Sequence, residues 1–144
     1  SRQPVLEEAK KLGVEKTFLI DLKSPSRNTA IKIWEDIGYY PRLTFDCTGW
    51  QLTNEIAFHA TKTGGKVIIM TNNENGGPFL LSNVVARDID LIVATTETDE
   101  STTAALRFLS TNKVFFSDSM YTHYDMSNVE AAFKHLNGPE WLDS

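Results

Sequence analysis

Three histidines and one cysteine are the side chains of this sequence best suited to metal or nucleophilic chemistry. His59, His123 and His135 are spaced so that no two lie one turn apart on a helix, and Cys47 is the only cysteine, so we predict no metal site. Each histidine is interpreted as an ordinary surface or capping residue, although His123 lies in an aromatic stretch. The neighbouring Asp46 opposes thiolate formation at Cys47, so we predict no catalytic residue in this chain.

The glycine pairs do not form a phosphate-binding loop. Gly64-Gly65 and Gly76-Gly77 lack the spacing that turns backbone N–H groups toward a pyrophosphate at a helix start. Asp21 closes an apolar run and could bind a ribose hydroxyl. Without a glycine-rich turn before it, however, such a residue is more often found in a turn or a cap.

Composition and charge exclude two classes of partner. Fourteen basic and nineteen acidic residues give a net charge of -5, and no Lys/Arg cluster is present, which argues against nucleic acid. Apolar runs such as 67–70 and 91–94 are far shorter than the ~20 residues needed to cross a bilayer, which argues against a membrane span. A lone cysteine in an apolar run suits a reducing compartment, so we expect a cytoplasmic protein.

Helical and extended segments alternate along the chain. The patterns predict helices over 5–12, 27–37, 52–63, 79–86, 100–109 and 127–136, and strands over 17–20, 43–47, 66–70 and 89–94. Ser26 is the expected N-cap of the second helix, and residues 127–130 are the expected capping box of the last. The strands are apolar at consecutive positions, as is typical when helices cover both faces of a sheet. We therefore expect one α/β domain over 1–144, built on a parallel sheet.

Such a sheet binds its ligand beyond the carboxyl ends of its strands. Four short segments follow predicted strands and should share one rim. They are Asp21, 47–49, 70–72 and 94–96.

Two runs resemble the cofactor domain of the medium-chain zinc alcohol dehydrogenases, and sorbitol dehydrogenases look most similar. The runs are Leu43-Thr44-Phe45-Asp46-Cys47-Thr48-Gly49 and Ala60-Thr61-Lys62-Thr63-Gly64-Gly65-Lys66-Val67-Ile68-Ile69-Met70. The similarity continues over 83–91, in 121–124 and in the helix beginning near 129, and residues 8–13 match the helix after that family's second strand.

This resemblance implies an incomplete Rossmann-like parallel sheet flanked by helices. The first strand, the glycine-rich turn and the zinc-bearing catalytic domain would then lie outside the chain, leaving the nucleotide-binding portion of an NAD(P)-dependent polyol dehydrogenase that is inactive alone. The alternative is a catalytically silent α/β binding or interaction module. The implied partners are a nicotinamide dinucleotide, and either the missing catalytic domain or a second copy of the chain; zinc belongs to the family but finds no ligands here.

The same resemblance assigns site residues. The implied cofactor-binding residues are Arg2, Cys47, Thr48, Gly49, Met70, Thr71, Asn72, Ala94 and Thr95, and Thr96 is the implied substrate-binding residue. The chain departs from the family where Thr71-Asn72 replaces a usual glycine, and where 95–97 replace a Phe-Arg-Tyr-like segment.

The cofactor type depends on Arg2. Ser1-Arg2 stands where NAD enzymes carry an acidic residue, and a guanidinium there would suit the 2′-phosphate of NADP. Alternatively, the acidic residue precedes Ser1 and Arg2 is only a solvated surface charge.

Overall fold

The computed structural model describes residues 3–71, 81–94, 97–111 and 121–137, and the chain divides into two compact units. One unit is Ile20–Thr98, and the other combines Ser1–Leu19 with Asp99–Ser144. The expectation of a single domain over 1–144 stays a prediction.

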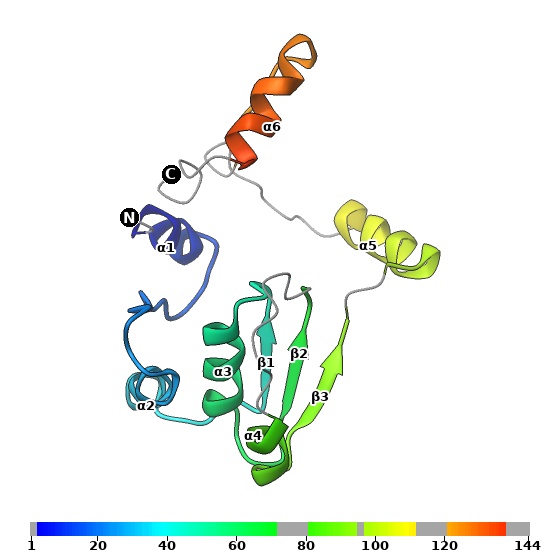
Figure 1. Ribbon diagram of the computed structural model, residues 1–144. Coiled ribbons are helices and arrows are strands. Elements are labelled where there is room, and N and C mark those ends of the chain that lie inside the picture. Colours follow the sequence, from blue (N-terminus) through cyan, green and yellow to red (C-terminus); the bar gives the residue numbers. More distant parts are fainter. Residues whose placement is uncertain (1–2, 72–80, 95–96, 112–120, 138–144) are drawn as a thin grey trace. The chain divides into compact units, whose positions relative to one another are not determined.

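The first unit contains a three-stranded parallel sheet in the order β1-β2-β3 (Figure 1). The strands are β1 (Leu43–Asp46), β2 (Lys66–Ile69) and β3 (Asp90–Val93). Their register pairs Asp46 with Ile69 and Ile69 with Val93, so all three strands end level with one another. The parallel α/β sheet expected from the sequence is confirmed.

Helices α2 (Ser26–Ile37), α3 (Gln51–Ala60) and α4 (Leu81–Ala86) accompany this sheet. In Figure 1, α3 lies beside β1 and α2 packs against α3. Helix α2 ends as expected at Gly38, which adopts φ 79° and donates its N–H to the Trp34 carbonyl at 2.8 Å. The core between α3, α4 and the strands comprises Ala57, Phe58, Val67, Val84 and Ile89.

The two faces of the sheet are unequally covered within this unit. Thr44 and Asp46 face α3, because their side chains form hydrogen bonds with the hydroxyls of Thr61 and Thr53. Side chains alternate along a strand, so Leu43 and Phe45 lie on the opposite face. Leu43 is 48% exposed and Phe45 is 53% exposed, and Ile92, in register with Phe45 through Ile68, is 40% exposed. Within this unit, α3 and α4 therefore pack on one face, and α2 packs against α3. The expectation of helices on both faces stays a prediction.

The strand expected over 17–20 is absent, and Leu19 is 66% exposed. A strand is stable only when its backbone groups pair with a neighbour, and no described segment pairs with this one. The expected N-cap is also wrong: Ser26 is the first residue inside α2, and its hydroxyl donates to Glu55 Oε2 at 3.0 Å.

The second unit contains α1 (Gln3–Lys11), α5 (Asp99–Thr111), the short 3-10 helix η2 (Met126–Asn128) and α6 (Val129–Asn137). The expected capping box at 127–130 is wrong. Ser127 lies inside η2, and Asp125 caps η2, because its Oδ1 accepts from the Ser127 N–H at 2.8 Å and from the Ser127 hydroxyl at 2.6 Å. These bonds lower the pKa of the Asp125 carboxyl. None of the helices in the described ranges is both long enough and apolar enough to span a membrane.

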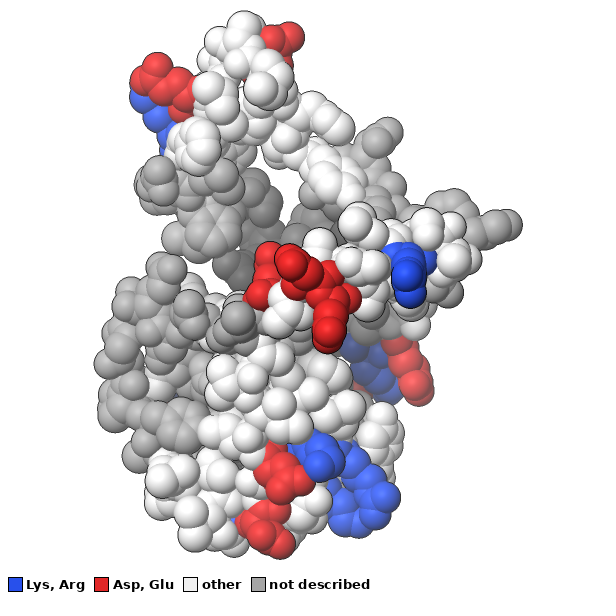
Figure 2. Space-filling model, turned by 90° about the vertical axis from the view of Figure 1, so that its right-hand side faces the viewer, with Lys and Arg blue, Asp and Glu red and all other residues white. Residues whose placement is uncertain are grey.

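The charged side chains are interspersed. On the face drawn in Figure 2, basic side chains lie next to acidic ones at several places, among uncharged residues.

Candidate functional site

The carboxyl ends of the three strands form one rim. Met70 donates its N–H to the Asp46 carbonyl at 2.9 Å, and Ala94 donates to the Ile69 carbonyl at 2.9 Å. Cys47, Met70 and Ala94, which directly follow β1, β2 and β3, are thereby brought together as the sequence predicted.

Asp21 does not follow a strand in the structure. Its Oδ1 accepts from the Lys23 N–H at 2.9 Å, and its carbonyl accepts from the Ser24 N–H at 3.0 Å. Asp21 is thus a turn residue, which was the second of its two interpretations.

Cys47 and Met70 place two sulfur atoms on the rim. The Cys47 Sγ lies 3.8 Å from the Met70 Sδ, and both residues are exposed. No described residue forms a bond to this thiol that would act as a base. Within the described ranges, no group of three or more His, Cys, Asp or Glu residues is arranged to hold a metal ion.

A buried carboxylate organises the turn between β1 and α3. Asp46 is 3% exposed, and its Oδ1 accepts from the Thr48 N–H and the Thr48 hydroxyl, each at 2.8 Å. Its Oδ2 accepts from the Thr53 hydroxyl at 3.2 Å. Three donors therefore satisfy this charge where the amino end of α3 also favours it.

The sequence analysis overlooked Asp46 and Thr53 as organisers of the site. Asp46 was treated only as the neighbour of Cys47. The available signal was an Asp followed two residues later by Thr, since such a pair bonds its own backbone in turns.

Gly49 and Trp50 complete the turn into α3. Gly49 is buried with φ 71°, a conformation that L residues with a side chain rarely adopt. Trp50 occupies the N-cap position without a side-chain cap bond and is 46% exposed. The turn therefore presents a backbone held by Asp46 and an aromatic ring beside the rim.

Thr71 supplies the clearest indication of a ligand. Its Oγ1 is buried and has no hydrogen-bond partner among the residues that the structure describes, although a buried hydroxyl left unpaired costs about 1 to 3 kcal/mol. The hydroxyl follows the central strand of the sheet, and a polar ligand at the rim would satisfy it.

Four predicted site residues lie outside the described residues: Arg2, Asn72, Thr95 and Thr96. The described candidates are Cys47, Thr48, Gly49, Met70, Thr71 and Ala94.

The opposite end of α3 is closed by Arg87. Its guanidinium donates to the carbonyls of Phe58 at 2.8 Å, His59 at 2.5 Å and Thr61 at 2.6 Å. Burial, followed by the charge of Arg87, lowers the pKa of His59. His59 therefore lies at the capped end of α3 with its side chain half-buried, and its interpretation as an ordinary surface or capping histidine stays a prediction.

The chain is similar in sequence and in fold to parts of known proteins. No protein-family model matches the sequence. Over 86 residues, the chain is 28% identical to the sorbitol dehydrogenase of Gallus gallus and 26% identical to that of Homo sapiens. The chain is distantly similar to sorbitol dehydrogenase. The alignments cover 60% of this chain but only 24% of each relative, so the matched region spans about a quarter of their length.

Solved structures show the same fold. An Escherichia coli short chain alcohol dehydrogenase complexed with NADH matches with a TM-score of 0.69 at 14% identity, over 93% of this chain and 38% of that one. An E. coli oxidoreductase involved in membrane biogenesis matches with a TM-score of 0.68 at 21% identity, over 94% and 38%. The resemblance drawn from the sequence and the Rossmann-like fold are both confirmed.

Proposed function

We propose that this chain is the nucleotide-binding portion of an NAD(P)-dependent polyol dehydrogenase similar to sorbitol dehydrogenase. The observation that carries the proposal is the unpaired, buried Thr71 hydroxyl beside the level ends of three parallel strands. The rim of such a sheet is where α/β proteins bind nucleotides. The NADH bound by a structural relative and the similarity to sorbitol dehydrogenase support the choice of ligand.

The roles of the described residues follow from their placement. Thr71 would exchange a hydrogen bond with the dinucleotide, and Cys47 and Met70 would contribute apolar contacts beside it. Asp46 and Thr53 act indirectly, because their bonds hold the turn that carries Gly49. The bound cofactor supplies hydride transfer, while the protein binds and orients it.

Binding of NADH to the full 144-residue chain tests this proposal. Energy transfer from tryptophan to NADH gives the signal, since Trp50 lies in the turn beside the rim. Thr71→Val removes the hydroxyl at nearly constant shape, and we expect it to weaken NADH binding about two- to tenfold, the value of one neutral hydrogen bond.

The matched control is Thr63→Val. Thr63 is an exposed threonine that precedes β2 and therefore lies at the other end of that strand. It should leave NADH binding unchanged. Absence of NADH binding, or equal weakening by the two substitutions, contradicts the proposal.

The second candidate function is a catalytically silent interaction module, and the uncovered sheet face favours it. The outer edge of β1 is also available. The backbone N–H groups of Lys66 and Met70 donate to the carbonyls of Arg42 and Asp46. Because backbone groups alternate in direction along a strand, those of Leu43 and Phe45 point away from β2. This edge of β1 pairs with no described strand, and with its exposed apolar side chains it would suit another protein chain, whether the catalytic domain that the resemblance implies or a second copy. Self-association without any NADH binding would select this function.

A further inference from the structure

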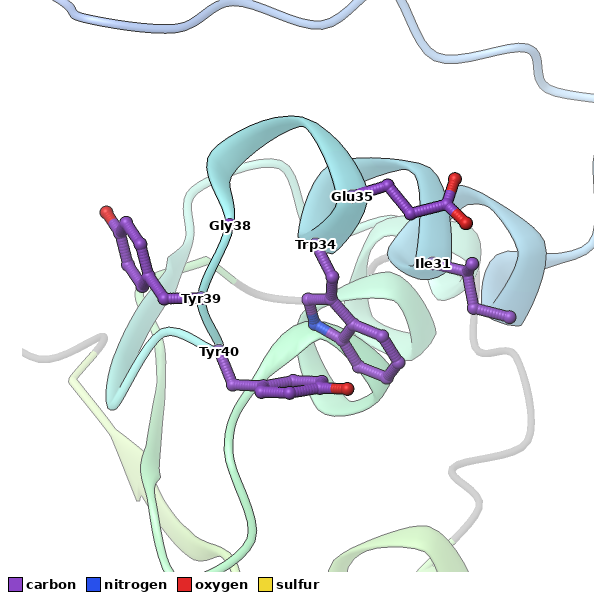
Figure 3. Close-up of a pocket in the computed structure, with 6 residues that line it drawn as sticks. All are labelled: Ile31, Trp34, Glu35, Gly38, Tyr39 and Tyr40. Carbon is purple, nitrogen blue, oxygen red and sulfur yellow. The ribbon is translucent and has the colours of Figure 1, made fainter.

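A hollow lined by aromatic residues lies at the carboxyl end of α2. It has a volume of about 490 Å³ and is lined by Ile31, Trp34, Glu35, Gly38, Tyr39 and Tyr40 (Figure 3). These residues lead into the beginning of β1, whereas the proposed nucleotide rim lies at the ends of the strands. The hollow is therefore independent of the proposed nucleotide site.

The rings of the hollow are held in place by the fold. Trp34 donates its indole N–H to the Ala60 carbonyl at 2.7 Å, and its ring centroid lies 4.4 Å from that of Tyr40 at an interplanar angle of 62°. Figure 3 shows Tyr39 on the other side of the Gly38 backbone from these two rings. A Cβ at Gly38 would meet nothing within 4 Å, so the space above this backbone is open.

The electrostatics of the hollow favour a positive ligand. The faces of indole and phenol rings carry negative potential and attract cations within about 6 Å of the ring centroid. Glu35 adds an exposed carboxylate that forms no ion pair with any described residue. The chain as a whole has a net charge of -5, which adds to the attraction.

Arg87 is the cation already near these rings. Its Cζ lies 5.8 Å from the centroid of the Trp34 ring, which shows that the indole accommodates a guanidinium. Its N–H groups are taken up by carbonyls at the carboxyl end of α3, where the helix dipole offsets positive charge. Tyr39 and Glu35, which also line the hollow, are available to a cation from another molecule.

We propose that this hollow binds a lysine or arginine side chain presented by a protein partner. An exposed bowl of about 490 Å³ is larger than a single ammonium group requires, so it also has room for neighbouring peptide atoms. Tyr39, which is 62% exposed, and Tyr40, which is 52% exposed, provide apolar surface for those atoms. Charge and shape thus both match a cationic side chain on a polypeptide.

The test uses a blocked Gly-Lys-Gly tripeptide and the same peptide with norleucine in place of lysine. Binding is followed by NMR through the indole N–H signals, of which Trp34 reports on the hollow and Trp50 serves as an internal reference. We expect saturable shifts of the Trp34 signal with the lysine peptide, and about tenfold weaker binding of the norleucine peptide. Shifts that do not saturate, or equal binding of both peptides, would overturn the proposal.

Variants separate the contributions of charge and aromatic surface. Glu35→Gln and Tyr39→Ala should each weaken the lysine peptide about two- to fivefold, as expected for an exposed ion pair or cation–π contact. Glu97→Gln, which removes an exposed acid that does not line the hollow, should have no effect. An equal effect of Glu97→Gln would reduce the observation to overall charge, and methylammonium binding as tightly as the peptide would identify a small amine instead of a protein partner; either result rejects the proposal.

Discussion

The guanidinium of Arg87 donates to the carbonyl oxygen of Thr61 at 2.6 Å and so joins the end of α4 to the end of α3. The last carbonyls of a helix have no partners within it. Arg87 satisfies three carbonyls at this end, and the Trp34 indole satisfies that of Ala60.

We therefore expect Arg87→Ala to lower the free energy of unfolding by about 2 to 3 kcal/mol, because it leaves half-buried carbonyls without a charged donor. Urea denaturation measures the change. Arg42→Ala removes an exposed arginine whose side chain bonds no described residue, and it should change stability by less than about 0.5 kcal/mol. Equal losses in the two variants would show that the carbonyl contacts of Arg87 do not stabilise the fold.

The lowered pKa of His59 predicts a pH dependence of stability. Burial and the charge of Arg87 place this pKa below the ordinary value of 6.5, so between the two values the unfolded chain binds more protons than the folded one. The stabilising contribution is complete above pH 6.5 and is lost as the pH falls toward the lowered pKa.

Urea midpoints at about pH 7.5 and about pH 5.5 should therefore differ less in His59→Gln than in the unchanged chain. His123→Gln is the control, because His123 is exposed and should leave the difference as it is. An unchanged difference in His59→Gln would refute the prediction.

The uncovered sheet face predicts self-association. Phe45→Lys places a charge on this face, and we expect it to weaken a dimer about tenfold or more, since burying one phenylalanine contributes about 1.5 to 3 kcal/mol. Sedimentation and the binding of a hydrophobic dye provide the measurements. Leu22→Lys, in an exposed turn of the same unit, should change neither. A clean monomer of the unchanged chain with little dye binding would count against the prediction.

Catalysis is not expected from the 144-residue chain alone. Its single cysteine and widely spaced histidines supply no predicted zinc site, and the matched region spans only 24% of the length of the sorbitol dehydrogenases. With sorbitol, zinc and NAD or NADP, the absorbance of reduced cofactor should stay at background. Turnover proportional to the concentration of this chain, after contaminants are excluded, would disprove the expectation.

Arg2 predicts a preference between the two nicotinamide cofactors. If its guanidinium meets the 2′-phosphate, Arg2→Ala should weaken NADP binding about 10- to 100-fold and leave NAD binding nearly unchanged. Calorimetric titration of both cofactors provides the comparison. Equal losses, or none, would favour the alternative in which Arg2 is a solvated surface charge.

The sequence by itself determined the alternation of elements in the central part of the chain. The apolar run that contains the buried Val67 is strand β2, and Gly38 ends α2 because glycine adopts its positive φ without cost. Both signals are local, since they depend on the hydrophobicity and backbone freedom of a few adjacent residues. For the same reason the rim positions after β1, β2 and β3 could be placed in advance, whereas Asp21 could not.

Contacts between distant residues were decided only by the tertiary structure. The β-rich run at 17–20 is not a strand, because strand formation depends on a pairing neighbour that local composition does not specify. Arg87 reaches carbonyls 26 to 29 residues earlier in the chain, and the Thr71 hydroxyl is unpaired only because the folded chain buries it. Propensity acts along the chain, whereas hydrogen-bond satisfaction depends on which groups folding brings together.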